Sequence, residues 1–349
     1  MARHWTGILF WLALSLMLGR AALAQDMAAV GDGKAPGLQP AETPCPDCPG
    51  CGEGCCGGYC DPVWTVRADA LLLNRSRLPD QTLLVDGTFK PRFNADQFDE
   101  PVQVGWEIDV TRRLNCDWDL EARYFDLGGQ SANSPTITSS NGAGVLYAPT
   151  AQGLFFPPLN NNLSYTSRLQ DVELNARRGP NDWLTLLAGF RYLDLDDRIL
   201  VNQLTTGNTA ATQKLEGFNS LLGFQIGADA SLWRRGSFSV DALVKAGIYD
   251  DLARNALTYD STSLAVHAAT GASADRAAFC GEIGITLDYD LTQRLSLRGG
   301  YQLLWLDGVA LASQQPIVNP PPLVGAATTV ATRGDLFYNG AFVGLEYRR

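Results

Sequence analysis

Histidine and long apolar runs are scarce in this chain, and positive charge is the minority sign. Only two histidines, His4 and His267, occur among 349 residues, which nearly excludes histidine-based acid–base chemistry. Lys and Arg number 27 against 37 Asp and Glu, for a formal net charge of -10 at pH 7. Nucleic-acid binding needs clustered Lys and Arg, so this balance argues against it. Beyond residue 24 no apolar run is long enough to predict a membrane-spanning helix.

The first 24 residues have the features of a secretory signal peptide. Arg3 precedes an apolar stretch over 8–18, and Ala22-Leu23-Ala24 offers a cleavage site of small residues. The apolar stretch, at about eleven residues, is shorter than the ~20 that span a bilayer. We therefore expect residues 1–24 to be removed on export, so that the mature chain begins at Gln25.

Residues 25–62 are rich in Cys, Gly and Pro and hold six of the eight cysteines. Four of these cysteines have the spacing C-x2-C-x2-C-x3-C, which occurs in iron–sulfur proteins and is also short enough for zinc. No Pro follows the fourth cysteine and no second run is present, which weighs against a cluster. We favour a disordered periplasmic tether with disulfides or cross-links, and we expect no cofactor. The weak metal candidates are Cys45, Cys48, Cys51 and Cys55.

From residue 63 onward, apolar and polar residues alternate with a period of two, as in strands that have one apolar face. In 102–111, one face carries only Val, Trp and Ile, and the other carries Gln, Gly, Glu, Asp and Thr. We predict ten strands, or twelve if 81–90 or 144–156 also form strands. The ten segments are 63–74, 102–111, 117–124, 165–177, 184–192, 218–229, 238–248, 279–289, 295–305 and 337–347.

Two features favour a membrane barrel over a soluble β-sandwich, whose apolar faces would point inward. The segments run about ten to fourteen residues, longer than an average soluble strand and enough for the nine to eleven that a bilayer needs. Their apolar faces carry no charge in the central stretches and have aromatic residues at the ends, as a lipid-facing band does. We therefore predict an all-β fold, an up-and-down antiparallel transmembrane β-barrel over 63–349.

The connections between the segments alternate between short and long, as in barrels with short periplasmic turns and long outer loops. With an even strand count, both ends of the barrel fall on the periplasmic side, next to the tether. Trp118, Trp183 and Trp233 would then lie at one membrane interface. The expected turns are 112–116, 178–181, 234–236 and 291–293, and the expected long loops are 75–100, 128–163, 195–214, 250–275 and 307–334.

Two short motifs, together with the signal peptide and the tether, carry a family resemblance. The barrel opens on Trp64-Thr65-Val66-Arg67-Ala68-Asp69-Ala70-Leu71 and closes on Phe342-Val343-Gly344-Leu345-Glu346-Tyr347-Arg348-Arg349. With these features the chain resembles a planctomycete-type outer-membrane β-barrel (porin-like) family. The resemblance implies the barrel fold and the outer-membrane location rather than a particular solute. Many outer-membrane barrels end in an aromatic residue, whereas here Tyr347 is followed by two arginines.

The polar faces of the strands would line the lumen. They either set the ion preference of an open pore or pair across a narrow barrel and block it, because ten or twelve strands fall between filled and open barrels. With Asp119, Glu173 and Asp288 included, acidic residues outnumber basic ones eight to four, which predicts weak cation preference in an open pore. The lumen-facing candidates are Glu107, Asp109, Glu121, Arg123, Arg191, Asp241, Lys245, Glu282 and Arg298.

We expect an outer-membrane protein that lets small solutes or ions pass through a polar lumen. The alternative is a non-conducting structural or surface-binding barrel that acts through its outer loops. Catalysis is not expected, because no G-x-S-x-G, H-E-x-x-H or P-loop sequence is present and His267 stands alone in a predicted loop. The expected partners are outer-membrane lipid and small solutes or ions, and no oligomeric state is predicted.

Overall fold

The computed structural model describes residues 62–85, 90–99, 101–115, 118–138, 160–181, 183–205, 208–262, 265–315 and 329–349. The predicted signal peptide (1–24) and all but the last residue of the predicted tether (25–62) lie outside these residues. Cys45, Cys48, Cys51, Cys55 and the optional strand 144–156 lie outside them as well. Within the described ranges, no helix has the length and apolar composition of a membrane span.

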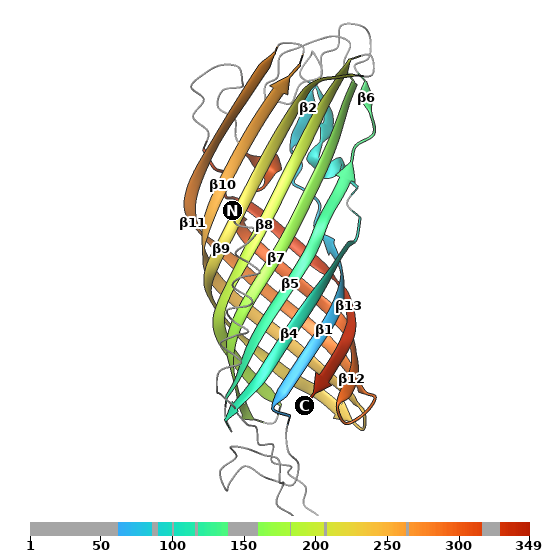
Figure 1. Ribbon diagram of the computed structural model, residues 1–349, viewed down its shortest axis with the longest axis vertical. Coiled ribbons are helices and arrows are strands. Elements are labelled where there is room, and N and C mark those ends of the chain that lie inside the picture. The colour runs from blue at the N-terminus through green and yellow to red at the C-terminus, as the bar shows by residue number, and fades with distance from the viewer. Residues whose placement is uncertain are drawn as a thin grey trace, which may run out of the picture.

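Ten long strands of the described chain close into one antiparallel barrel (Figure 1). Around the wall their order is β5-β4-β1-β13-β12-β11-β10-β9-β8-β7, and β5 pairs with β7 to close the ring. The ten-strand barrel is thus confirmed. The wall strands are β1 (Trp64–Arg75), β4 (Gln103–Asn115), β5 (Trp118–Asn133), β7 (Asn160–Asn181), β8 (Leu184–Thr205), β9 (Asn208–Arg235), β10 (Phe238–Ser261), β11 (Val266–Asp290), β12 (Leu295–Val309) and β13 (Gly334–Arg348).

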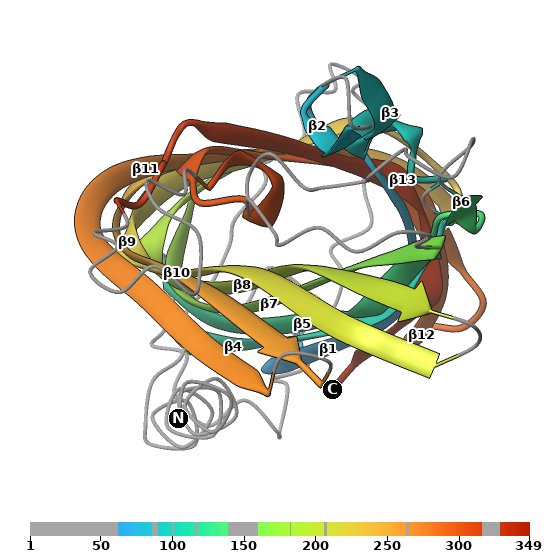
Figure 2. The same cartoon turned by 90° about the horizontal axis from the view of Figure 1, so that it is seen from above.

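Three short strands and two short helical turns are not part of this ring. β2 (Thr82–Val85) and β3 (Pro91–Asn94) form a separate hairpin beside the barrel mouth (Figure 2). The optional strand at 81–90 therefore does not enlarge the barrel to twelve strands. β6 (Ile137–Thr138) only extends the edge at β7, and the 3₁₀ turns are η2 (Ala95–Gln97) and η4 (Ala312–Gln314).

The outer wall is apolar and the inner wall is charged, as the alternation predicts. Trp106, Phe224 and Ile285 are 47%, 50% and 51% exposed on the outer face. Lys245 and Glu282, both on the opposite side of the wall, are each only 3% exposed. Such a continuous apolar band is unfavourable in water and favourable in contact with lipid acyl chains.

Strands β7 to β11 are 22 to 28 residues long, although nine to eleven residues cross a bilayer. They rise above the other strands on one side of the barrel (Figure 1). Along β8 the apolar residues change sides, because Leu186 and Phe190 are exposed outside whereas Leu193 and Leu195 are buried inside. We take the membrane-spanning part to end at this switch, which is Tyr192 on β8. The upper half has the polar-out, apolar-in pattern of a water-soluble fold.

Two of the predicted long loops, 195–214 and 250–275, are wrong. β8 continues to Thr205 before β9 begins at Asn208, and β10 continues to Ser261 before β11 begins at Val266. The change of apolar side interrupts the alternation and resembles the end of a strand. His267 accordingly lies on β11, where its Nδ1 atom contacts Oδ1 of Asp260 on β10.

The lower end of the barrel holds the beginning of β1 and the end of β13 (Figure 1). The backbone N–H of Trp64 donates to the carbonyl oxygen of Arg349 at 2.8 Å. The turn between β9 and β10 contains Gly236 at φ +61°, a conformation that side chains disfavour. Exposed tryptophans near this end suit a membrane interface. They are Trp118, Trp183 and Trp233.

Candidate functional site

A polar cavity of about 800 Å³ occupies the lower part of the lumen. Pro62, Trp233 and Arg234 line it at the lower end, and its highest lining residues on β10 and β11 are Lys245 and Glu282. We call this cavity the vestibule. Its charged lining residues are Arg67, Asp69, Glu107, Asp109, Arg113, Asp119, Glu121, Arg123, Arg177, Asp229, Arg234, Asp241, Lys245, Glu282, Asp288, Arg298, Glu346 and Arg348.

A cluster of buried ion pairs forms the ceiling of the vestibule. Arg123 donates from Nη1 to Glu173 Oε1 at 2.8 Å and to Glu282 Oε1 at 2.6 Å. Its Nη2 donates to Glu107 Oε2 at 2.7 Å. Lys245 Nζ lies 2.8 Å from Glu173 Oε2. Each carboxylate therefore has a cationic partner, which a buried charge requires.

The same cluster extends upward through Arg191 on β8. Its Nε donates to Asp171 Oδ1 at 2.9 Å, and its Nη1 lies 2.9 Å from Glu282 Oε2. The side chains of Arg191 and Asp171 are at most 1% exposed. Because Glu282 meets both Arg123 and Arg191, the pairs form one network rather than separate bridges.

The position of these strands around the wall makes the network span the lumen. Arg123 is on β5 and Glu282 is on β11, which lies five strands away around the ten-strand ring. Two strands five apart face each other across the barrel, yet these two side chains are 2.6 Å apart. The ion pairs therefore fill the barrel from wall to wall at this level, as side chains do in narrow barrels.

An apolar layer lies directly above the ion pairs. β1, β5 and every wall strand from β7 to β13 contribute buried side chains to it. No member is more than 8% exposed. Apart from its two tyrosine hydroxyls the layer is apolar, and it opposes the entry of ions. Its larger members are Leu71, Leu73, Phe125, Leu127, Leu169, Leu193, Leu195, Leu221, Tyr249, Leu304, Leu306, Leu311, Leu336, Tyr338 and Phe342.

A short segment after β12 covers this layer and contacts the wall at β9. Figure 2 shows it, in orange-red, inside the barrel mouth. The Ala310 N–H donates to Asn219 Oδ1 at 2.6 Å, and Asn219 Nδ2 donates back to the Ala310 carbonyl at 2.9 Å. Gly217 permits this approach, because a Cβ atom there would lie 2.5 Å from the Ala310 carbonyl oxygen. We call residues 310–315 the cap.

Asp197 on β8 fastens the cap to two other strands. Its Oδ2 accepts the Ala312 N–H at 2.8 Å, and its Oδ1 accepts Arg75 Nη1 at 3.0 Å and the Tyr165 hydroxyl. The Arg75 guanidinium also lies 4.9 Å above the Tyr165 ring centroid, within cation–π range. Burial raises the pKa of Asp197 above its ordinary value, although Arg75 and the Ala312 N–H act to lower it.

One protein-family model matches the chain over residues 160–334, and its description is Putative beta barrel porin-7 (BBP7). The chain belongs to this family. Together with the closed barrel and its apolar outer wall, the family assigns the protein to the outer membrane. No curated protein sequence matches the chain.

Solved outer-membrane barrels are similar to this beta barrel porin-7 protein only in general form. The outer membrane protease OmpT from Escherichia coli is 9% identical, over 82% of this chain and 96% of its own, at a TM-score of 0.46. The translocator domain of the autotransporter NalP from Neisseria meningitidis is 12% identical, over 82% and 88%, at 0.35. The toluene transporter TodX from P. putida is 11% identical, over 82% and 89%, at 0.27.

The nine side chains predicted to face the lumen all lie on the inner side of this porin-7 barrel. Arg191 lies above the vestibule, and Arg298 Nη1 lies 3.6 Å from Asp69 Oδ2 inside it. The role of these nine side chains in ion passage stays a prediction. The eight that line the vestibule are Glu107, Asp109, Glu121, Arg123, Asp241, Lys245, Glu282 and Arg298.

Several partners of these side chains were not among the predicted residues. Arg67 Nε donates to Glu346 Oε2 at 2.6 Å, and Arg177 pairs with Glu121. In β1, Arg67 is followed by Ala68, Asp69 and Ala70. Because the residues of the apolar face here are small alanines, the alternation that predicts a strand is weak. Asn175 and Gln225 donate hydrogen bonds to Glu173. Both are uncharged, so the pattern of inward charges does not point to them.

Proposed function

We propose that this barrel is a porin-family protein whose passage is closed at rest. Solutes and ions enter the vestibule from the lower end, which is the predicted periplasmic end. They cross the membrane only when the ion-pair network, the apolar layer and the cap separate. Passive passage through a permanently open lumen, the simpler form of the hypothesis, has less support from the geometry.

The observation that carries this proposal is the contact between Arg123 and Glu282 across the barrel. A water-filled pore needs the inward side chains of these two strands to be separated by more than a hydrogen bond. The buried layer above adds a second barrier, because hydrating apolar surface and moving ions across it both cost free energy. The polar vestibule below is the part of the lumen that suits dissolved solutes.

Planar-bilayer recording of the full-length folded protein tests the proposal. At low voltage, in KCl at about 1 M so that surface charges are screened, we expect no steady conductance. The double variant Tyr249→Ala/Leu306→Ala shortens two layer residues on different strands and so lowers one of the three barriers, and it should produce brief openings more often than the unaltered protein does. The matched control, Phe224→Ala/Ile285→Ala, removes similar volume from the outer wall and should not. Steady stepwise conductance of the unaltered protein would overturn the proposal.

The opened variant also tests the charge of the pathway. Ten acidic and eight basic side chains line the vestibule, so we expect weak cation preference in reversal potentials across a KCl gradient. Anion preference would contradict the predicted ion preference of the pathway, but it would not contradict the proposal that the pathway is closed at rest. Heat-modifiable migration on gels checks that each variant is folded.

A surface-binding role is the second candidate. The upper halves of β7 to β11 form a tall wall with a buried apolar interior, held by Asp197 and the cap, which is more structure than a passage needs. Rigid elements of this kind can present a binding surface. We propose that neither role involves catalysis, which the family supports, although a barrel fold by itself does not exclude an enzyme.

A further inference from the structure

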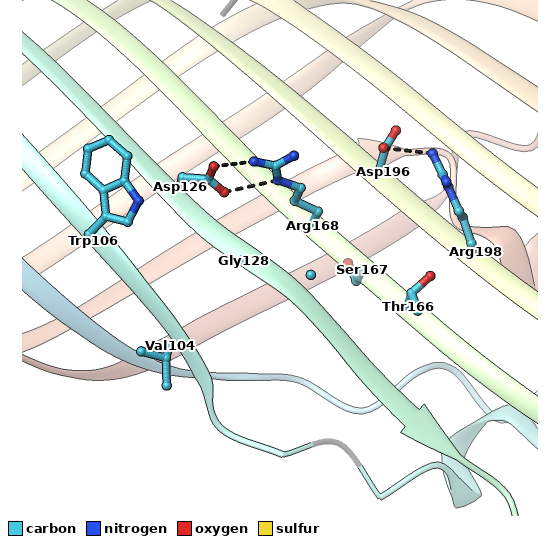
Figure 3. A pocket seen from close by; sticks show the side chains of 10 residues that line it. Val104, Trp106, Asp126, Gly128, Thr166, Ser167, Arg168, Asp196 and Arg198 are labelled. Atoms are coloured by element: carbon cyan, nitrogen blue, oxygen red, sulfur yellow. Dashed lines mark hydrogen bonds and ion pairs between the residues drawn. The ribbon is translucent and has the colours of Figure 1, made fainter. Parts of the chain in front are cut away.

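A hollow of about 310 Å³ lies on the outer wall where β4, β5, β7 and β8 run side by side (Figure 3). Its apolar side is Val104 and Trp106 on β4, which are 66% and 47% exposed. Its other side carries charged residues of β5, β7 and β8. The hollow thus sits where the apolar band ends and the outward charges begin, the level of lipid headgroups.

The hollow exists because β5 bulges there. Leu127 pairs with Leu169 and Gln130 pairs with Ser167, so β5 advances by three residues where β7 advances by two. The extra residue falls at Gly128-Gly129, as is usual for a β-bulge. A Cβ atom added at Gly129 would meet nothing within 4 Å. The two glycines therefore leave the space that a side chain would otherwise occupy.

The charged side of the hollow offers both signs. Arg168 Nε donates to Asp126 Oδ1 at 3.1 Å, and Arg168 Nη2 also contacts that carboxylate. Arg198 Nη2 donates to Asp196 Oδ2 at 3.0 Å. The arginine side chains are 29% and 32% exposed. Among the residues that line the hollow, two cations and two anions balance in charge, and Figure 3 shows Asp126 and Arg168 between Trp106 and the pair Asp196 and Arg198.

We propose that this hollow binds the headgroup of a zwitterionic phospholipid that carries a primary ammonium group. The phosphate lies against the guanidinium groups of Arg168 and Arg198. The ammonium group donates to the carboxylates of Asp126 and Asp196, and an acyl chain lies along Val104 and Trp106. A purely anionic headgroup fits less well, because it would place negative charge beside both carboxylates without an amine to bond them.

Native mass spectrometry of the full-length barrel tests this site with two lipids, phosphatidylethanolamine and phosphatidylglycerol, offered in equal amounts from mixed micelles. We expect the unaltered protein to retain the ethanolamine lipid at least about fivefold more than the glycerol lipid, which corresponds to about 1 kcal/mol. Equal retention of the two lipids, or preference for the glycerol lipid, would overturn the proposal.

Two variants locate the binding. Gly129→Leu fills the hollow without removing a charge, and Arg198→Gln removes one cation without filling it. Both should abolish the preference. The matched control, Asp250→Asn, changes an exposed outward charge on β10, away from the hollow, and should leave the preference intact. Retention of the preference in Gly129→Leu, with folding verified by heat-modifiable migration, would also overturn the proposal.

Discussion

Replacing Arg123 with methionine is expected to lower the free energy of unfolding by about 3–5 kcal/mol. Arg123 is the cation that Glu107, Glu173 and Glu282 share. Methionine keeps most of the volume but leaves these carboxylates with only Lys245 and Arg191 as cationic partners among the described residues. A buried carboxylate without its partner is costly, because the lumen supplies little water at this level. Urea unfolding of the barrel in lipid vesicles, followed by tryptophan fluorescence, measures the loss.

Two further variants separate this effect from a general loss of charge. Arg254→Met changes an exposed arginine on the upper part of β10 and should alter stability by at most about 0.5 kcal/mol. Adding Glu282→Gln to Arg123→Met removes one uncompensated carboxylate and should recover part of the loss. Equal losses for Arg123→Met and Arg254→Met would contradict a lumen filled by ion pairs.

Replacing Arg75 with methionine is expected to loosen the upper half of the barrel by a similar amount, about 3–5 kcal/mol at pH 8. Arg75 and Asp197 are both fully buried, and Asp197 also holds the cap through Ala312. Without Arg75 the Asp197 carboxylate keeps only hydrogen bonds. Arg77→Met, at an exposed position close by, is the matched control. Limited proteolysis of the upper half, read as the rate of cleavage, measures the loosening.

The loss in Arg75→Met should depend on pH. Burial already raises the pKa of Asp197, and removing Arg75 raises it further, so the folded variant binds a proton that the unfolded chain releases near 3.8. Stability contributed by that proton is present below the unfolded pKa and is lost as pH rises through the folded pKa. The deficit relative to the unaltered protein should be largest at pH 8 and shrink toward pH 4. A deficit of constant size would show that Arg75 acts through packing alone.

The sequence predicted the part of the fold that the bilayer imposes. A lipid-facing wall must be apolar at every second residue, so segments such as 238–248 stand out by alternation alone. The upper half obeys a different rule, because its outer wall faces water and its inner wall is packed. On β8 the apolar series therefore moves from Phe190 on the outside to Leu193 on the inside, and alternation alone could not distinguish this switch from a strand end.

The inward direction of the charged side chains was also predictable, whereas their pairing was not. Arg123 and Glu282 are 159 residues apart, and their contact depends on the strand count and on the stagger between strands. A different stagger would place Glu282 opposite another residue. The hollow beside Trp106 was missed for a related reason, because the two glycines at the β-bulge carry no side chain that would show the one-residue shift in alternation.

Accessibility of spin labels along β8 tests the central claim most directly. In full-length protein whose native cysteines are replaced by serine, single cysteines from 184 to 204 would be labelled and exposed to oxygen, which partitions into lipid, or to a water-soluble nickel complex. Labels at Leu186 and Phe190 should respond to oxygen, labels at Leu193 and Leu195 to neither reagent, and labels at Arg198 and Asn202 to nickel. Nickel access at Leu193 and Leu195 would contradict the closed lumen, and oxygen access continuing to Asn202 would contradict the switch at Tyr192.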